Sequence, residues 1–347
     1  MSSIASLFGI QVPIVQAPMA GVQLGALAAA VSEAGGLGSL PCALLTPESM
    51  AKEIGVIRAR TGKPFNVNFF CHVPPTPDAA REAAWRERLG PYYGEFGIDA
   101  ASIPAGPGRA PFDDAFADAL EPLRPPVVSF HFGLPSESLV KRVKGWGAKV
   151  ISSATTVDEA RWLEAHGVDA VIAQGLEAGG HRGMFLTDDL TTQVGTFSLL
   201  PQVVGAVKVP VIATGGISTA EGVAATMALG AAGVQVGTAF MLCPESTTSA
   251  VHRTALKSER ARHTALTNIF TGRPARIIVN RAARELGPIN PAAPAFPLAT
   301  AAMAPLRAKA EAQSSSDFSP IWSGQNASGC REVPAADLLR ELARRLG

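Results

Sequence analysis

Val211-Ile-Ala-Thr-Gly-Gly-Ile-Ser218 joins a short β-branched run to two glycines and then to the start of a helix. Gly233-Val-Gln-Val-Gly-Thr238 repeats the apolar run and the glycine one helix further along the chain. Continuous apolar runs of this length are typical of strands that are buried on both faces of a parallel sheet. The two stretches therefore predict consecutive βα units, in which each strand ends in a glycine loop.

Six more runs of this kind occur upstream, which brings the candidate strands to eight, the number that a closed barrel needs. The predicted strands are Val12–Ala17, Leu37–Leu40, Phe65–Asn68, Val127–His131, Lys149–Ser153, Ala170–Gln174, Val211–Thr214 and Gly233–Val236. Between them, Thr46-Pro47 resembles an N-cap with a first-turn proline, and Thr156–Glu159 and Ser218–Glu221 fit the capping box. The prediction is an α/β fold, a (β/α)₈ TIM barrel.

The rest of the chain predicts additions to this barrel. The barrel itself is assigned to residues 1–243, with a long insertion at about 74–126. Residues 244–312 are predicted to form a smaller, mainly helical subdomain at the substrate site. Residues 313–347 are predicted to be a C-terminal segment whose amphipathic helix returns to the barrel. Long connections in a compact domain are usually functional or carry extra structure.

Composition limits the possible partners. The formal net charge of +1 gives no electrostatic reason to expect nucleic acid or an anionic membrane. The uncharged stretch Gly222–Cys243 contains four glycines, which favour helix, loop and strand over a membrane span. Without a secretory signal at the start, and with four scattered cysteines, we expect a cytoplasmic protein with free thiols. A small-molecule partner and a monomer or homodimer are the resulting expectations.

The glycine loops after the seventh and eighth strands predict a phosphate site. Bare backbone at Gly215-Gly216 and Gly237-Thr238 can approach an anion, and the helix that begins near Ser218 points its N–H groups at it. The alternative is that these glycines only make tight turns between strand and helix. Because both loops carry the pattern, we favour the phosphate site.

Polar residues end two other strands and predict contacts to a flat ring. Asn68 and Gln174 place amides where an isoalloxazine would find complementary donors and acceptors, unless they bond only to neighbouring backbone. The turn Ala17-Pro18-Met19 would press on one face of such a ring with backbone and a thioether. No dinucleotide fingerprint, P-loop, G-x-S-x-G or H-E-x-x-H motif is present.

His181 is the candidate base, because it stands between glycines in the loop Glu177–Gly183 and an imidazole titrates near neutrality. His72 and His131 follow strands and are predicted to line the same cavity, with a buried structural role as the alternative. The other three histidines, His166, His252 and His263, lie in helical patterns and are predicted to be on the surface.

Seven stretches together resemble the nitronate monooxygenases (older name 2-nitropropane dioxygenases), and the similarity covers nearly the whole chain. They are QAPMAGV (16–22), FNVNFFCH (65–72), VSFHFGLPS (128–136), AQGLEAGGHRG (173–183), ATGGIS (213–218), GVQVGTAF (233–240) and IWSGQ (321–325). NFFCH with SFHFG looks like the class I branch. The resemblance implies an FMN enzyme without a metal, with His181 as base and with His72, His131 and Phe296 in the substrate pocket. It implies FMN contacts at Ala17, Pro18, Met19, Asn68, Gln174, Gly179, Gly180, Gly215, Gly216, Gln235, Val236, Gly237 and Thr238.

The implied reaction is oxidative denitrification. His181 would take an α-proton from a nitroalkane, or a nitronate would bind directly, and O₂ would be consumed to give a carbonyl compound and nitrite. The chain departs from the class I pattern at residues 295–304: where that pattern has tyrosines and a lysine, this sequence has Phe296, Thr300 and Ala304.

Three alternatives remain at this point. An NAD(P)H-dependent quinone or enoyl reductase could use the same flavin and the same barrel. A metal-dependent hydrolase could use the three strand-end histidines as ligands, but no H-x-H follows the first strand and no acidic residue ends the eighth. A flavin-binding protein without turnover is disfavoured by the presence of His181.

Overall fold

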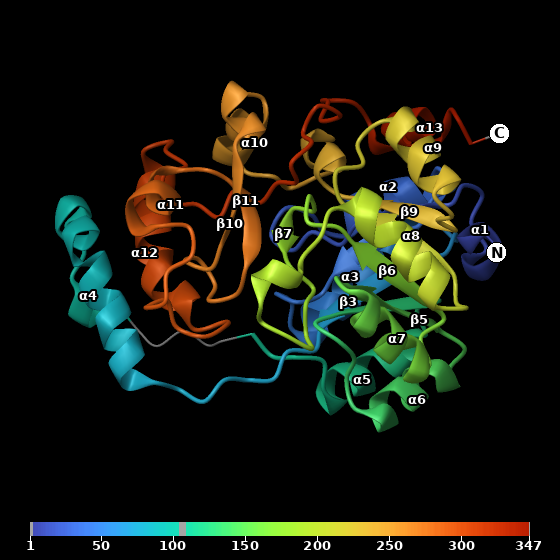
Figure 1. Cartoon of the computed structure of the whole chain (residues 1–347), viewed down its shortest axis with the longest axis horizontal. Coiled ribbons are helices and arrows are strands. Elements are labelled where there is room, and N and C mark those ends of the chain that lie inside the picture. The colour runs from blue at the N-terminus through green and yellow to red at the C-terminus, as the bar shows by residue number, and fades with distance from the viewer. Residues whose placement is uncertain (1–2, 104–108, 347) are drawn as a thin grey trace.

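The computed structural model describes residues 3–103 and 109–346 and contains a barrel with a second lobe beside it (Figure 1). The barrel sheet is parallel, in the order β1-β9-β8-β6-β5-β4-β3-β2. Its strands are β1 (Ile14–Gln16), β2 (Gly38–Pro41), β3 (Phe65–Phe70), β4 (Val127–His131), β5 (Lys149–Ala154), β6 (Ala170–Gln174), β8 (Val211–Thr214) and β9 (Gly233–Val236). A parallel bridge between Val15 and Leu37 joins β1 to β2 and closes the barrel. All eight predicted strands are confirmed, with small shifts at some ends.

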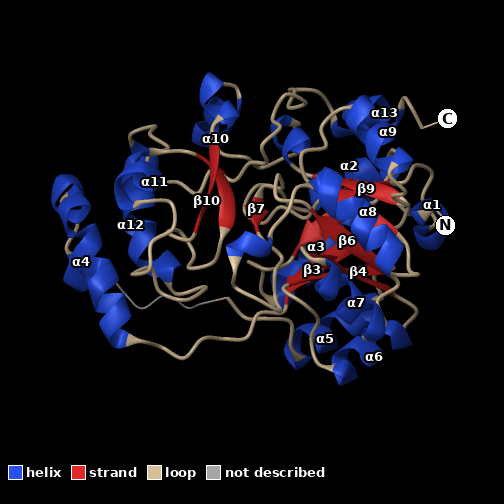
Figure 2. Cartoon of the chain, in the orientation of Figure 1, coloured by secondary structure: helices blue, strands red, loops and turns tan. Residues whose placement is uncertain are grey.

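Successive side chains along each strand point alternately into the barrel and out towards the helices, so the sheet packs against two separate cores. Inward-facing residues such as Val15, Ile151 and Ile172 pack on Ile4 and Phe8 of α1 (Ile4–Phe8), which plugs the amino-terminal end of the barrel. Outward-facing residues pack under a ring of helices (Figure 2). These helices are α2 (Gly25–Glu33), α3 (Pro47–Arg60), α5 (Asp114–Leu120), α6 (Glu137–Gly145), α7 (Val157–Ala165), α8 (Thr196–Ala206), α9 (Ala220–Ala228) and α13 (Ala335–Ala343). The carboxyl ends of the strands are thus left to form a site.

The predicted helix starts are confirmed in two cases and shifted in one. Thr46 caps α3 ahead of its first-turn proline, and Thr156 caps α7 by accepting from the Glu159 N–H. For α9 the cap is Thr219, which accepts from Gly222 N, so the prediction of Ser218 was one residue early. Two adjacent hydroxyl residues precede this helix, and either could cap it by sequence alone.

The second lobe mixes helices with a small antiparallel sheet. Its sheet has the order β10-β11-β7, from β10 (Thr264–Thr267), β11 (Ala275–Ile278) and β7 (Gly180–His181). Its helices are α4 (Ala79–Phe96), α10 (Ala250–Leu256), α11 (Arg281–Leu286) and α12 (Ala299–Ala312). Residues 244–312 were predicted to be mainly helical, and the two short strands β10 and β11 within them were not predicted. β10 pairs with β11, and β11 also pairs with β7, which comes from a distant part of the sequence.

The long insertion contributes to both lobes. Its helix α4 packs along α12, where Trp85, Leu89 and Tyr93 are buried and the Tyr93 hydroxyl donates to Ala302 O at 2.7 Å. Its helix α5 packs on the barrel through Phe116. Figure 1 shows α4 and α12 side by side at the end of the molecule that is far from α1. The chain between α4 and α5 therefore crosses from the second lobe back to the barrel.

Candidate active site

A cavity of about 300 Å³ lies at the carboxyl ends of the barrel strands, between the two lobes. Fourteen of the predicted site residues line it: Ala17, Pro18, Met19, Asn68, His131, Gln174, Gly179, Gly180, His181, Gly215, Gly216, Gln235, Gly237 and Thr238. Three do not: Val236 is buried within β9, and His72 and Phe296 lie outside the lining. Parallel strands bring their carboxyl ends to one rim, which explains why residues so far apart in sequence meet.

Backbone conformation and close packing favour glycine at the part of the rim that was predicted to hold phosphate. Gly215 and Gly216 have φ angles of 119° and 71°, a region that favours glycine. A Cβ on Gly215 would lie 2.6 Å from Thr196 Oγ1, and one on Gly179 would lie 2.5 Å from Gly324 N. The backbone of these loops is therefore pressed together and exposed to the cavity without side chains.

The C-terminal segment completes this rim. Gly324 N donates to Thr238 Oγ1 at 3.0 Å, and Asn326 Nδ2 donates to Gly216 O at 3.0 Å. Both residues line the cavity, as do Trp322 and Ser323. IWSGQ (321–325) is one of the stretches that carry the family resemblance, but none of its residues was predicted to belong to the site. One concave surface is thus formed by the glycine loops that follow β6, β8 and β9 together with the segment around Gly324. We call it the glycine cradle; its residues are Gly179, Gly180, Gly215, Gly216, Gly237, Thr238 and Gly324.

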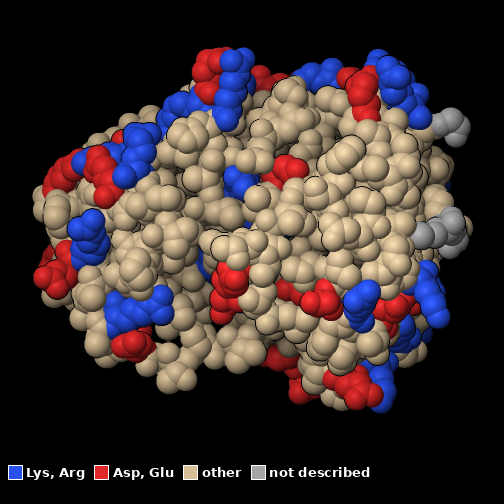
Figure 3. All heavy atoms as spheres, viewed as in Figure 1, with Lys and Arg blue, Asp and Glu red and all other residues tan. Residues whose placement is uncertain are grey.

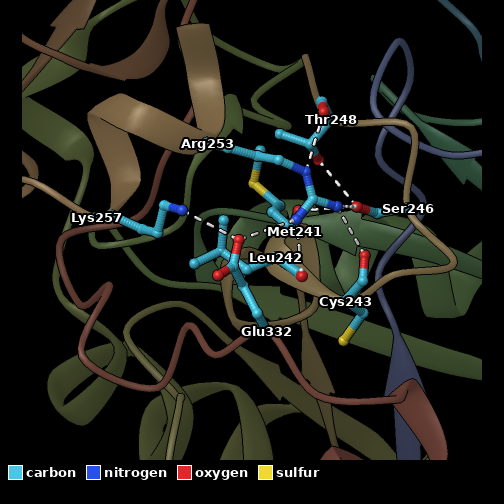
Figure 4. Close-up of polar contacts among 8 residues, drawn as sticks. All are labelled: Met241, Leu242, Cys243, Ser246, Thr248, Arg253, Lys257 and Glu332. Carbon is cyan, nitrogen blue, oxygen red and sulfur yellow. Dashed lines mark hydrogen bonds and ion pairs between the residues drawn. The ribbon is translucent and has the colours of Figure 1, made fainter. Parts of the chain in front are cut away.

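An arginine network fixes the segment that follows β9, as Figure 4 shows. Arg253 donates to the carbonyls of Leu242 and Cys243 at 2.9 and 2.8 Å, and to Ser246 Oγ at 2.9 Å. The first two carbonyls lie at the end of the short helix η4 (Thr238–Leu242), and the Cys243 carbonyl also accepts from Ser246 N at 3.1 Å. Because η4 begins at Thr238, this network holds that residue in place at the cradle.

The two predicted amides differ in what they contact. Gln174 uses both ends of its amide on backbone: Nε2 donates to His181 O at 3.0 Å, and Oε1 accepts from Gly183 N at 2.8 Å. It therefore holds the loop that carries the candidate base. Asn68 Nδ2 donates to Ser129 Oγ at 2.9 Å. The buried Oε1 of Gln235 has no hydrogen-bond partner within the described part of the chain, which leaves it available to a ligand.

His181 lies on β7, where the second lobe meets the cavity. Its Nε2 is 2.9 Å from Thr271 Oγ1, and its ring centroid is 5.3 Å from that of Trp322. Burial lowers the pKa of His181 well below its usual range, and the nearby charges of Arg109 and Arg273 lower it further. Burial and these charges therefore favour the neutral imidazole, which is the form that a general base needs.

His131 and His72 differ in their relation to the cavity. His131 lines it, with Nδ1 at 2.9 Å from Ser153 Oγ and Nε2 at 3.2 Å from His181 O, and burial lowers its pKa to about 3. His72 instead packs edge-on against Phe296, with ring centroids 4.8 Å apart. Both residues of this pair are buried in an aromatic layer next to Phe70, which itself lines the cavity.

One of the three histidines predicted to be on the surface is buried. His252 is 4% exposed, lines the cavity and has Nε2 2.9 Å from Trp322 O, so that prediction was wrong. The reason is that the C-terminal segment returns over α10 and covers it. His166 and His263 are exposed, as predicted.

Several cavity residues were not predicted as site residues. Arg109 comes from the long insertion, Thr271 from the loop before β11, and Met303 from α12. None of them follows a barrel strand, so the rule that located the other residues could not locate them. Within residues 3–103 and 109–346, no group of three or more His, Cys, Asp or Glu side chains is arranged to hold a metal ion.

A (β/α)₈ barrel that gathers a glycine cradle and a buried histidine around one cavity has the architecture of a barrel enzyme. The chain belongs to the nitronate monooxygenase family, a family of oxidoreductases, because the model of that family matches residues 1–345. It is 44% identical to a nitronate monooxygenase of Pseudomonas aeruginosa over 98% of this chain and 97% of the relative.

Two solved structures share this fold. A nitroalkane oxidase from Streptomyces ansochromogenes is 40% identical and superposes with a TM-score of 0.90, covering 99% of this chain and 98% of that chain. FabK from Thermotoga maritima is 27% identical with a TM-score of 0.71, covering 99% and 96%. The barrel and its second lobe therefore recur together in both structures.

The face of the molecule seen in Figure 3 carries no large patch of a single charge. On the face seen in Figure 3, Lys and Arg are interspersed with Asp and Glu around the edge of the molecule. None of the helices in the described part of the chain has the length and apolar character needed to cross a membrane.

Proposed function

We propose that this chain catalyses the FMN-dependent oxidation of nitronates and nitroalkanes by O₂ to a carbonyl compound and nitrite. The observation that carries the proposal is that His181 and the glycine cradle border the same cavity. A small-molecule enzyme of this kind is expected to act in the cytoplasm as a monomer or homodimer.

The residues of the cavity fit FMN. Main-chain N–H groups of the cradle suit a terminal phosphate, and the unpartnered Gln235 Oε1 suits a ring N–H. A Cβ on Gly237 would be in ordinary contact with Ala17 Cβ at 3.4 Å and Met19 Sδ at 3.6 Å, and glycine leaves that volume free beside the cavity. When bound, FMN would supply the electron acceptor and the reaction with O₂.

The protein itself would bind the substrate and move the proton. His181, neutral because it is buried, would accept the α-proton of a nitroalkane, and Thr271 would keep its ring oriented. A preformed nitronate has already lost this proton and needs only to be bound. The aromatic residues Phe70 and Trp322 would limit the access of water to the reacting atoms.

We expect the purified protein to be yellow, with one noncovalently held FMN per chain, because the cradle suits a single terminal phosphate. Heat-released cofactor can be compared with FMN and FAD standards by chromatography. Release of FAD, or a colourless protein that FMN does not reconstitute, would contradict the proposal. Rapid bleaching of the flavin by NADH or NADPH without nitronate would favour a reductase on the same barrel.

The departure from the class I pattern gives a second prediction. Thr300, Met303, Ala304 and Arg307 line the cavity from one face of α12. We expect Thr300→Tyr combined with Ala304→Lys to lower the KM for small nitronates roughly tenfold, because a phenol and an ammonium add charge-assisted hydrogen bonds to the anion.

Steady-state kinetics with flavin-loaded enzyme tests this, and Ala308→Lys is the matched control. Ala308 is exposed on the same helix and does not line the cavity, so the added charge there should leave KM unchanged. If the double variant and the control behave alike, α12 does not contact the substrate.

A further inference from the structure

Arg109 brings a positive charge to the cavity near the candidate base. It lies in the long insertion between β3 and β4, and its side chain lines the cavity. Its guanidinium carbon is 5.5 Å from the centre of the Phe296 ring, and that ring is 5.3 Å from the ring of His181. The charge and the candidate base therefore contact the same aromatic ring.

The charge of Arg109 is not neutralised by the described residues. None of their carboxylates lies within 4.0 Å of its guanidinium, and the segment just before it, residues 104–108, contains no acidic residue. The side chain is half-buried, and burial lowers its pKa to about 10, so it remains protonated at neutral pH. A partly desolvated cation without a counter-ion attracts an anion into the cavity.

Two other arginines, Arg307 at the cavity and Arg182 next to it, are already engaged. Arg307 lines it too, but its Nε donates to Glu311 at 2.8 Å and its side chain is 47% exposed. Arg182 is fully buried and donates to Gln193 and to the carbonyls of Gln174 and Gly175. Among these cations, Arg109 alone combines contact with the cavity and an uncompensated charge.

We propose that Arg109 binds the two oxygens of the nitronate group and thereby makes the anion the preferred form of the substrate. A planar guanidinium matches a planar pair of oxygens with two parallel hydrogen bonds. Arg109 would thus supply, from the insertion, the positive charge that is missing at Ala304 on α12. This inference rests on the proposed function for the identity of the anion.

The test compares Arg109→Met with Arg109→Lys in the FMN-loaded enzyme. Methionine keeps an unbranched apolar stem and removes the charge, so we expect kcat/KM for a small nitronate to fall about 10- to 100-fold. The loss with the neutral nitroalkane should be clearly smaller. Lysine keeps the charge without the planar fork and should restore part of the activity. Flavin content and circular dichroism establish that each variant is folded.

Nitrate, a planar oxyanion that cannot react, provides a readout that is independent of turnover. Calorimetric titration of the holoenzyme should give a nitrate Kd that rises by the same factor in Arg109→Met. The exposed, cavity-distant Arg262→Met is the control for the loss of one charge, and Arg307→Met tests the competing cation.

The outcomes separate the two proposals. Loss of nitrate binding in Arg109→Met supports Arg109 as the anion site even if the wild type fails to oxidise nitronates, a failure that would overturn the proposed function. Unchanged nitrate affinity and unchanged nitronate kinetics in Arg109→Met would overturn the inference. So would a loss confined to Arg307→Met, or a wild type that binds no nitrate.

Discussion

Replacement of His181 by asparagine is expected to slow the oxidation of neutral nitroalkanes by roughly 10²–10⁴-fold, the usual range for loss of a general base. The oxidation of preformed nitronates should fall little, because their α-proton is already gone. Asparagine keeps a polar group near Thr271 Oγ1, which lies 2.9 Å from Nε2 in the native protein, but it cannot accept a proton at neutral pH. The measurement is therefore the ratio of nitroalkane oxidation to nitronate oxidation, which should fall in His181→Asn.

A control is needed because β7 also belongs to the sheet of the second lobe. Thr271→Val removes the hydroxyl next to the ring and leaves the imidazole, so it should reduce nitroalkane turnover much less than the asparagine variant. Flavin content should be unchanged in both. Equal losses on nitroalkane and nitronate in His181→Asn would show that His181 serves binding or architecture and is not the base.

The pH dependence of the wild type follows from the lowered pKa of His181. Only the neutral imidazole accepts a proton, so kcat/KM for the nitroalkane should stay level from alkaline to neutral pH. It should fall on the acid side, at a pH below the ordinary histidine value of about 6.5. This acid limb should be absent with preformed nitronate or in His181→Asn. A limb centred at or above the ordinary value would contradict the burial of the ring.

The barrel could be predicted from the sequence because its signals are local. Val211–Thr214 and Gly233–Val236 are apolar runs that end in glycine, and the structure has strands with these same bounds. In contrast, β10 and β11 carry no such signal: β10 pairs with β11, and β11 also pairs with Gly180 and His181, about ninety residues earlier. Pairing between distant segments cannot be read from a short pattern.

The same distinction holds for the site. Residues such as Gln174 and Gly216 were located because each follows a parallel strand, and the rule that such loops converge is general. Arg109 reaches the cavity because the insertion that carries it folds over the barrel, and His252 because the C-terminal segment covers it. The residues next to them in the sequence carry no pattern that predicts either position. The role of Gln174 also needed the structure, since only there is its amide seen to bond to the loop of His181.

Replacement of Gly216 by aspartate is expected to weaken FMN binding about 10³-fold while the barrel remains folded. Two unit charges about 4 Å apart repel by about 4 kcal/mol at an effective dielectric constant of about 20, and a carboxylate at the cradle would face the phosphate. Gly216 has a φ of 71°, which aspartate tolerates better than most residues, and a Cβ there would be 3.3 Å from Glu177 Cβ. The residue can therefore be introduced with a small adjustment of Glu177.

Gly216→Asn separates the charge from the shape, because asparagine has the same size and the same tolerance of positive φ. The carboxylate of Glu177 accepts from Thr196 N at 2.8 Å and would also repel an aspartate at position 216. That repulsion acts on the protein without FMN, so it should lower the Tm of the apo-protein for Asp relative to Asn. Repulsion from the phosphate instead appears only with the cofactor: added FMN should raise the Tm of the wild type and, less strongly, of Gly216→Asn, but not of Gly216→Asp. If Asp and Asn bind FMN equally well, the phosphate does not lie at Gly216, and the cradle must then be interpreted as a set of tight turns that bring the loops of β6, β8 and β9 together.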